Sequence, residues 1–197
     1  MTALDAQFQL ASERKAKQIA TQFETARLHI RASQLADLDA TYVLANASAA
    51  ALYEWMPWAH PTPLLDSMQH YFASVEAKWA SREMLDFQWC DKATGALIGK
   101  GGFHHIDWAI PKFEIGYWLG SAYVGQGYCT EAAKGLVNFA KTELAARRIE
   151  IRSQPNNTAS RRVAERAGFT LEGINRQALL GADGILKDAC MYALVVE

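Results

Sequence analysis

A glycine-bearing segment carries the first sign of chemistry in this sequence of 197 residues. Gly125 and Gly127 flank Gln126, and a helical pattern begins directly after them. Glycine lets the main chain approach a ligand closely, and the first turn of a helix presents N–H groups without intrahelical partners. With the positive end of the helix dipole, such groups bind phosphate oxygens. The segment therefore predicts either a diphosphate site or a plain tight turn.

Two common phosphate motifs do not fit this segment. It lacks the Gly-Lys-Ser/Thr run of a P-loop, which supplies a lysine to the phosphate and a hydroxyl to magnesium. Gly120, Gly125 and Gly127 do not give G-x-G-x-x-G, and no strand–helix–strand unit opens the chain as in a Rossmann domain. We expect any diphosphate here to bind without a metal.

A second polar segment, residues 157–169, stands at the start of a short helix. Asn157 occupies an expected N-cap position, Ser160 falls in the first turn, and Gly168 follows the helix as a C-cap. The two polar side chains either cap the helix or contact a ligand.

Hydrophobic periodicity supplies the elements that position these segments. We expect an amphipathic helix over residues 3–24, an extension in front of one domain over residues 25–197. The domain should contain strands at 25–31, 85–90, 96–106, 112–119, 148–154, 169–174 and 188–196, and helices at 33–43, 64–82, 127–145 and 158–167, with Ser33 as an N-cap and residues 55–58 irregular. This order predicts a mixed α+β sheet rather than a doubly wound one.

Composition limits the class of protein. Half of the residues are hydrophobic, which is enough for a substantial core. Net charge is −1, so neither nucleic acid nor an acidic membrane is an expected partner. Residues 147–176 hold seven Arg and three acidic residues, an excess that indicates either a solvated face or an anion site.

The three cysteines, Cys90, Cys129 and Cys190, lie far apart in the sequence. They form no zinc-ligand spacing and no disulfide framework. The first residues lack the apolar core of a signal peptide, and no apolar run is long enough to cross a bilayer. We expect a cytoplasmic protein without a metal.

Together the two polar segments resemble those of the GNAT superfamily of N-acetyltransferases. The cofactor motif of that family, Q/R-x-x-G-x-G/A, maps onto residues 124–129, with Val124 and Cys129 at the two positions that depart from it. The N-x-x-S…GF segment and Leu171-Glu172-Gly173 are similar to the branch that acetylates the N-terminal serine or alanine of ribosomal proteins. The resemblance runs from about residue 27 to the C-terminus.

This resemblance implies a mostly antiparallel, splayed sheet flanked by helices, the acyl-CoA acyltransferase fold. It also implies acetyl-CoA as co-substrate and direct transfer to a primary amine, such as a protein or peptide N-terminus. Asn157 would contact the cofactor and Ser160 would donate a proton to the departing sulfur. Main-chain groups of Tyr117, Trp118 and Leu119 would bind the pantetheine arm. The pyrophosphate would be bound by the main-chain groups of the glycine segment, Val124, Gly125, Gln126, Gly127, Tyr128, Cys129 and Thr130.

The sequence indicates less clearly which residue is the base that deprotonates the amine. Glu114 stands on an expected strand, on the face of Gly116, and is either that base or an outward carboxylate. His104 and His105 adjoin it, and strand alternation predicts that at most one of them reaches the site. Trp55 and Trp58 either line the acceptor mouth or pack in the core.

Two further features leave the acceptor and the assembly open. Leu179 stands where the ribosomal-protein branch suggests an acidic residue. The alternatives are therefore a small-molecule amine, such as an aminoglycoside or a polyamine, and an inactive CoA-binding module. The N-terminal helix should pack on its own domain or on a second copy in a homodimer.

Overall fold

The computed structural model describes residues 3–59 and 62–196 of the chain. Its centre is an eight-stranded sheet with the order β1-β2-β3-β4-β5-β6-β8-β7. Neighbouring strands are antiparallel except β5 and β6, which are parallel. The strands are β1 (Gln22–Glu24), β2 (Leu28–Ala32), β3 (Leu85–Asp91), β4 (Leu97–Asp107), β5 (Lys112–Leu119), β6 (Arg148–Ser153), β7 (Thr170–Leu180) and β8 (Leu186–Val195).

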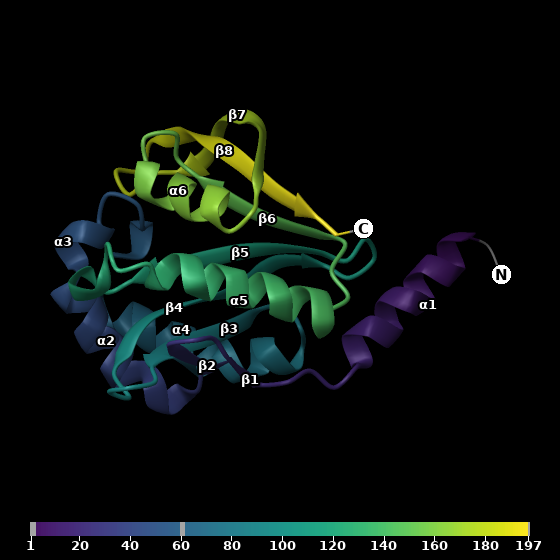
Figure 1. Cartoon of the computed structure of the whole chain (residues 1–197), viewed down its shortest axis with the longest axis horizontal. Helices are drawn as coiled ribbons and strands as arrows, with labels where there is room; N and C mark the ends of the chain where they lie inside the picture. Colours follow the sequence, from purple (N-terminus) through teal and green to yellow (C-terminus); the bar gives the residue numbers. More distant parts are fainter. Residues whose placement is uncertain (1–2, 60–61, 197) are drawn as a thin grey trace.

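Helices cover both faces of this sheet (Figure 1). Helix α5 (Tyr128–Thr142) lies across the front of β3 to β5. Behind these strands pack α2 (Leu38–Ala47), α3 (Ala49–Leu52) and α4 (Leu65–Ala80). The short helix α6 (Thr158–Arg166) lies beside β6 to β8. None of the helices in the described ranges has the length and apolar character needed to span a bilayer.

Aromatic rings fill the layer between the sheet and α5. Phe139 of α5 lies 5.3 Å from Phe87 of β3 and 6.2 Å from Phe103 of β4, measured between ring centroids. Edge-to-face and stacked pairs at these distances add to the stabilisation from burial. Since side chains alternate along a strand, the residues next to these phenylalanines face the opposite side, toward α2 and α4.

The sheet opens between β5 and β6. Their pairing covers only residues 112–114 of β5 and 148–150 of β6, although both strands continue beyond it. Past Glu114, no residue of β6 is in register with β5 in the described chain. The splayed sheet expected from the resemblance is therefore confirmed, and a gap lined by main chain runs between the two strands.

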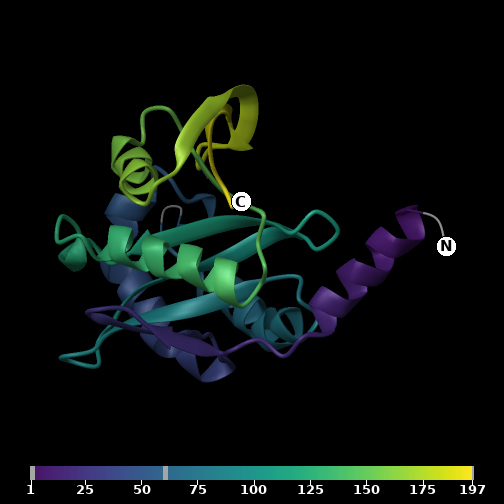
Figure 2. The same cartoon turned by 45° about the vertical axis from the view of Figure 1, so that its right-hand side comes forward.

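The prediction of one helix over residues 3–24 is wrong beyond Ala16. Helix α1 (Ala3–Ala16) ends there, Ile19 is buried, and Phe23 lies on β1, which pairs with β2. The alternating exposure of β1 was hidden in a sequence that also fits a helical period. Figure 2 shows α1 extending away from the body of the molecule, and Leu10 on it is 49% exposed.

Three other boundaries differ from expectation. Ser33 is buried and does not cap a helix; Gln34 precedes a short 3-10 turn, and α2 begins at Leu38. Helix α5 stops at Thr142, before Ala145 with its φ of +51°. Strand β7 continues to Leu180, well past the expected end at residue 174, because its pairing with β8 resumes after a bulge.

Candidate active site

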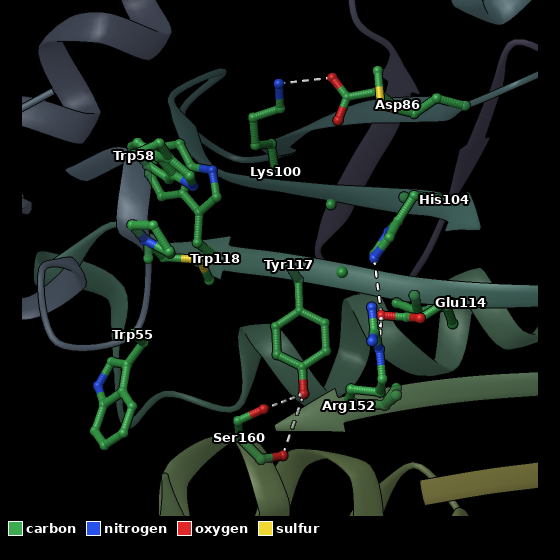
Figure 3. Close-up of a pocket in the computed structure, with 18 of the residues that line it drawn as sticks. Trp55, Trp58, Asp86, Lys100, His104, Glu114, Tyr117, Trp118, Arg152 and Ser160 are labelled. Atoms are coloured by element: carbon green, nitrogen blue, oxygen red, sulfur yellow. Dashed lines mark hydrogen bonds and ion pairs between the residues drawn. The ribbon is translucent and has the colours of Figure 1, made fainter. Parts of the chain in front are cut away.

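A cavity of about 590 Å³ occupies the gap between β5 and β6 and extends over the sheet toward α4. The floor includes the cross-strand pair Gly102 and Gly116, which leave the main chain of β4 and β5 bare. Figure 3 shows polar side chains on three sides of this space and aromatic rings on the fourth.

Tyr117 and Ser160 meet at one side of the cavity. The Tyr117 hydroxyl lies 3.1 Å from Ser160 Oγ and donates to the Ser160 carbonyl at 3.2 Å. Burial raises the pKa of Tyr117, so the phenol stays protonated at neutral pH. Asn157 caps α6 by accepting from the Ser160 N–H at 3.0 Å, as one of the two hypotheses for it required, and it also lines the cavity. The sequence pointed to Ser160 and to the Tyr117 main chain, but it gave no sign that the two hydroxyls touch.

The glycine segment forms an open loop at the start of α5. Gly125 and Gly127 have φ values of +77° and +82°, in the left-handed region that favours glycine. No backbone carbonyl in the described chain accepts from the N–H groups of residues 125–127. The loop thus presents free donors beside the N-terminal end of a 15-residue helix, an arrangement suited to an anion.

Glu131 of α5 fastens this loop to the strand β2 and the turn before it. Its Oε1 accepts from the Thr25 hydroxyl at 2.6 Å and from the Arg27 N–H at 2.7 Å, and its Oε2 accepts from Arg27 Nε at 2.7 Å. Arg27 Nη1 in turn donates to the Gln126 carbonyl at 3.0 Å, and the guanidinium lies over the Tyr128 ring. Through Arg27, this network supplies a hydrogen-bond donor to the Gln126 carbonyl of the loop. Arg27 and Glu131 were not among the sequence-predicted site residues.

Replacing Glu131 with alanine should lower the free energy of unfolding by about 1–3 kcal/mol, because it leaves the hydroxyl of Thr25 and the N–H of Arg27 without their acceptor. Urea unfolding followed by circular dichroism measures this. Lys134→Gln, at an exposed position one turn along α5, is the matched control and should change stability by less than about 0.5 kcal/mol. Equal stability of the Glu131→Ala variant and the parent would show that the network is not holding the loop.

Glu114 lies at the opposite side of the cavity from Ser160 and is 7% exposed. Oε1 is 3.0 Å from His104 Nε2 and 2.8 Å from Arg152 Nε, and Oε2 is 3.1 Å from His105 Nδ1. Burial by itself would raise the pKa of Glu114, but the hydrogen bonds and charge at His104 and Arg152 outweigh it and lower the pKa to about 2. The carboxylate is therefore ionised at any physiological pH.

The prediction that at most one of the two histidines reaches the site rested on strand alternation. That alternation does not hold here, since both histidines contact the Glu114 carboxylate. The regular pairing of β4 with β5 breaks after His104, and His105 has a φ of +46°. This bulge turns two consecutive side chains toward the same strand. Of the two, only His104 also lines the cavity.

The three groups His104, His105 and Glu114 bring ligand-type atoms within 4.8 Å of one another. A metal ion there would compete with the Arg152 guanidinium, which contacts Glu114 at 2.8 Å and His105 Nδ1 at 3.2 Å. Because that cation already balances the carboxylate, we assign no metal to this cluster.

The remaining walls combine a buried ion pair with apolar side chains. Lys100 Nζ lies 2.7 Å from Asp86 Oδ2, and both residues are 6% exposed. The ammonium also lies 4.3 Å from the centroid of the Tyr71 ring, a favourable cation–π geometry. Apolar and aromatic residues complete the wall, among them Trp55, Trp58, Trp118, Met56, Met68, Met84, Leu179 and Leu180. Trp55 and Trp58 thus both border the cavity, and Trp58 also packs against Trp118.

A family model described as an acetyltransferase (GNAT) domain matches residues 27–170, which is most of the chain. The chain belongs to the GNAT acetyltransferase family. The matched range contains the loop at Gly127, Glu114, Tyr117 and Ser160, so the features described above lie within the GNAT domain. The fold expected from the sequence motifs is confirmed.

Curated GNAT relatives match about half of the chain. The ribosomal-protein-serine acetyltransferase of Escherichia coli is 35% identical over 101 residues, which are 51% of this chain and 56% of that protein. An uncharacterized N-acetyltransferase of Bacillus licheniformis, p20, is 36% identical over 104 residues, 53% and 58% of the two chains. The chain spans about half the length of these curated relatives in the matches.

Solved GNAT structures match nearly the whole chain. Mycobacterium smegmatis RimJ in complex with CoA-disulfide superposes with a TM-score of 0.78 and 25% identity, over 86% of this chain and 82% of that one. The ribosomal L7/L12 α-N-protein acetyltransferase RimL gives a TM-score of 0.80 at 24% identity, over 87% and 96%. At this identity, the RimL match supports the shared fold.

Proposed function

We propose that this GNAT protein transfers the acetyl group of acetyl-CoA directly to a primary amine, with the α-amino group of a protein or peptide as acceptor. One observation carries the proposal. A single cavity at the strand splay has a hydroxyl pair, Tyr117 and Ser160, on one side and an ionised carboxylate with its histidine, Glu114 and His104, on the other. Transfer of an acetyl group from a thioester to an amine is assisted by a proton acceptor beside the amine and a proton donor beside the departing sulfur.

The co-substrate would lie along the free edge of β5 and end at the open loop. The family resemblance assigns the pantetheine arm to Tyr117, Trp118 and Leu119, and the described part of β6 leaves that edge of β5 unpaired. The loop amides from Val124 to Thr130 would bind the pyrophosphate, and Asn157, whose carbonyl oxygen caps α6, has its amide nitrogen left for the cofactor. RimJ, a relative in fold, holds CoA in its disulfide form.

Direct attack fits the cavity better than a covalent acyl-enzyme. Cys129 is the cysteine nearest the loop, and burial raises the pKa of its thiol to about 12. A thiol with such a pKa supplies almost no thiolate nucleophile at neutral pH. Ser160 is hydrogen-bonded to Tyr117 and would act as the proton donor to the departing sulfur.

The charges that line the cavity favour a singly charged acceptor. Among the described lining residues, the two carboxylates are already paired, Asp86 with Lys100 and Glu114 with Arg152. A polyamine or an aminoglycoside carries several ammonium groups, which would need unpaired carboxylates. An α-amino group has a pKa near 7.7–8.0, so a useful fraction is neutral at pH 7. Leu179 and Leu180 at the wall suit an apolar stretch of peptide.

Acetyl-CoA should stabilise the folded protein without added metal, by about 2.7 kcal/mol at a concentration one hundred times its dissociation constant. Thermal unfolding with acetyl-CoA, with and without EDTA, measures this. Release of free thiol in the presence of N-terminal peptides, spermidine and an aminoglycoside then identifies the acceptor class. Binding of acetyl-CoA without release of CoA thiol in the presence of any of these amines would favour the CoA-binding module. Activity on spermidine or the aminoglycoside alone would favour a small-molecule acceptor.

Assembly and location stay predictions. Helix α1 contacts the body of the molecule near its C-terminal end, where Arg14 Nη1 donates to the Trp108 carbonyl at 3.2 Å. The rest of it points away (Figure 2), so a second copy of the chain is one partner that could cover it. A homodimer and a cytoplasmic location are both compatible with this arrangement.

A further inference from the structure

We infer that His104 takes the proton from the acceptor ammonium group while Glu114 orients the imidazole, an assignment that rests on the proposed acetyl transfer. His104 lies on β4, beside Glu114 on β5, and its side chain borders the cavity (Figure 3). Strand alternation predicted that at most one of the two histidines reaches the site, and the bulge at residues 104–107 instead turns both toward Glu114.

The contact with Glu114 decides which nitrogen of His104 is basic. An ionised carboxylate can only accept hydrogen bonds, so His104 Nε2, 3.0 Å from Oε1, must carry the hydrogen. In a neutral imidazole the other nitrogen, Nδ1, then holds the free lone pair. No hydrogen-bond partner for Nδ1 exists among the described residues. The ring therefore presents a fixed acceptor.

The absence of a side chain at Gly116 leaves room for the His104 ring next to β5. A Cβ atom at position 116 would lie 2.6 Å from His104 Cε1 and 3.2 Å from Nδ1. The edge of the ring that bears Nδ1 thus lies against the bare main chain of β5, on the cavity floor. Tyr117 follows directly on β5 and carries the hydroxyl that touches Ser160. The nitrogen of the substrate amine would approach between His104 Nδ1 and the hydroxyl pair of Tyr117 and Ser160.

The neighbours of His104 make Glu114 itself the poorer base. Arg152 on β6 neutralises the Glu114 carboxylate and holds it ionised, so it has little tendency to take a proton from an ammonium group. Histidine is the side-chain type that ordinarily exchanges protons near neutral pH. Among the described residues that line the cavity, the other charged or titratable side chains are Asp86 on β3, Lys100 on β4, Tyr71 on α4 and Tyr117 on β5. His105 on β4 contacts Glu114 beside them.

The proton transfers balance as follows. His104 Nδ1 takes one proton from the ammonium group, and the neutral amine attacks the thioester carbon, forming the C–N bond. As the C–S bond breaks, its electron pair leaves on sulfur, which takes a proton from the Ser160 hydroxyl. The bonded nitrogen gives up its second proton, which restores Ser160, and the imidazolium returns its proton to water.

The test compares His104→Gln and His104→Asn with His70→Gln, a matched control at an exposed position of α4 that does not line the cavity. With an N-terminal peptide as acceptor, both His104 variants should lose roughly 100-fold or more in kcat. Their acetyl-CoA dissociation constants should stay within about threefold of the parent. His70→Gln should stay within about threefold in kcat.

The pH profile separates proton transfer from a structural role. In the His104 variants the rate should follow the ionisation of the peptide amine and recover as pH rises toward 9, and added imidazole should restore part of it at pH 7. Parent-like kcat and pH profile in a His104 variant would overturn the inference and leave the proposed function standing. A parent protein that binds acetyl-CoA but acetylates no amine would overturn both.

Discussion

Replacing Ser160 with alanine should lower the rate of acetyl transfer by roughly 10- to 1000-fold, which overlaps the range of roughly 100- to 10,000-fold typical of general acids. The hydroxyl is placed to meet the sulfur as it departs, and Tyr117 holds it at 3.1 Å. Because this interaction strengthens only as negative charge develops on sulfur, its loss should raise the barrier without weakening the bound state. The expected signature is a lower kcat with an almost unchanged acetyl-CoA dissociation constant.

A steady-state assay of thiol release gives kcat, and calorimetric titration with acetyl-CoA gives the dissociation constant. Thr158→Ala is the matched control, since Thr158 is an exposed residue in the same turn of α6. It should change kcat by less than about threefold, because its side chain does not border the cavity. A Ser160→Ala variant as fast as the control would reduce Ser160 to a residue of the helix start.

Glu114 should make the stability of the protein depend on pH in the acid range. Its pKa in the folded protein is about 2, against an ordinary value of 4.5. A carboxyl group with a lowered pKa stabilises the folded state above its unfolded pKa, and that contribution is lost as pH falls through the folded pKa. The difference corresponds to roughly 3 kcal/mol, present above about pH 4.5 and lost progressively toward pH 2.

Urea unfolding of the parent and of Glu114→Gln between pH 2.5 and pH 7 measures this contribution. The variant should be less stable at pH 7, where Arg152 loses its charged partner, and the two proteins should converge as the pH falls. Glu172→Gln provides the control, because that carboxylate pairs with Arg148 on an exposed surface. Parallel stability curves for the parent and Glu114→Gln would contradict the low pKa of Glu114.

Local sequence signals predicted most of the elements and the glycine turn before α5. The left-handed conformations at Gly125 and Gly127, the cap at Asn157 and the extent of the strand β5 each depend on neighbours a few residues away. Such features follow from backbone sterics and short-range hydrogen bonds, which a sequence displays directly. The placement of Glu114 on the face of Gly116 is of the same kind.

The N-terminal error shows where local signals end. Residues 17–24 fit a helical period, yet the strand β1 forms because β2 offers it an edge and α5 offers Phe23 a ring to pack on. The ring on α5, that of Phe139, lies more than a hundred positions from Phe23 in the sequence. Tertiary packing overrode local propensity there.

The sequence by itself determined that this chain carries a GNAT loop, a capped helix with Ser160 and a strand with Glu114. Only the tertiary structure decided how they meet. The splay of β5 from β6 brings Tyr117 to Ser160, and the bulge in β4 turns His104 and His105 to the same carboxylate. Strand register and bulges are set by pairing between distant segments, so no local pattern contains them.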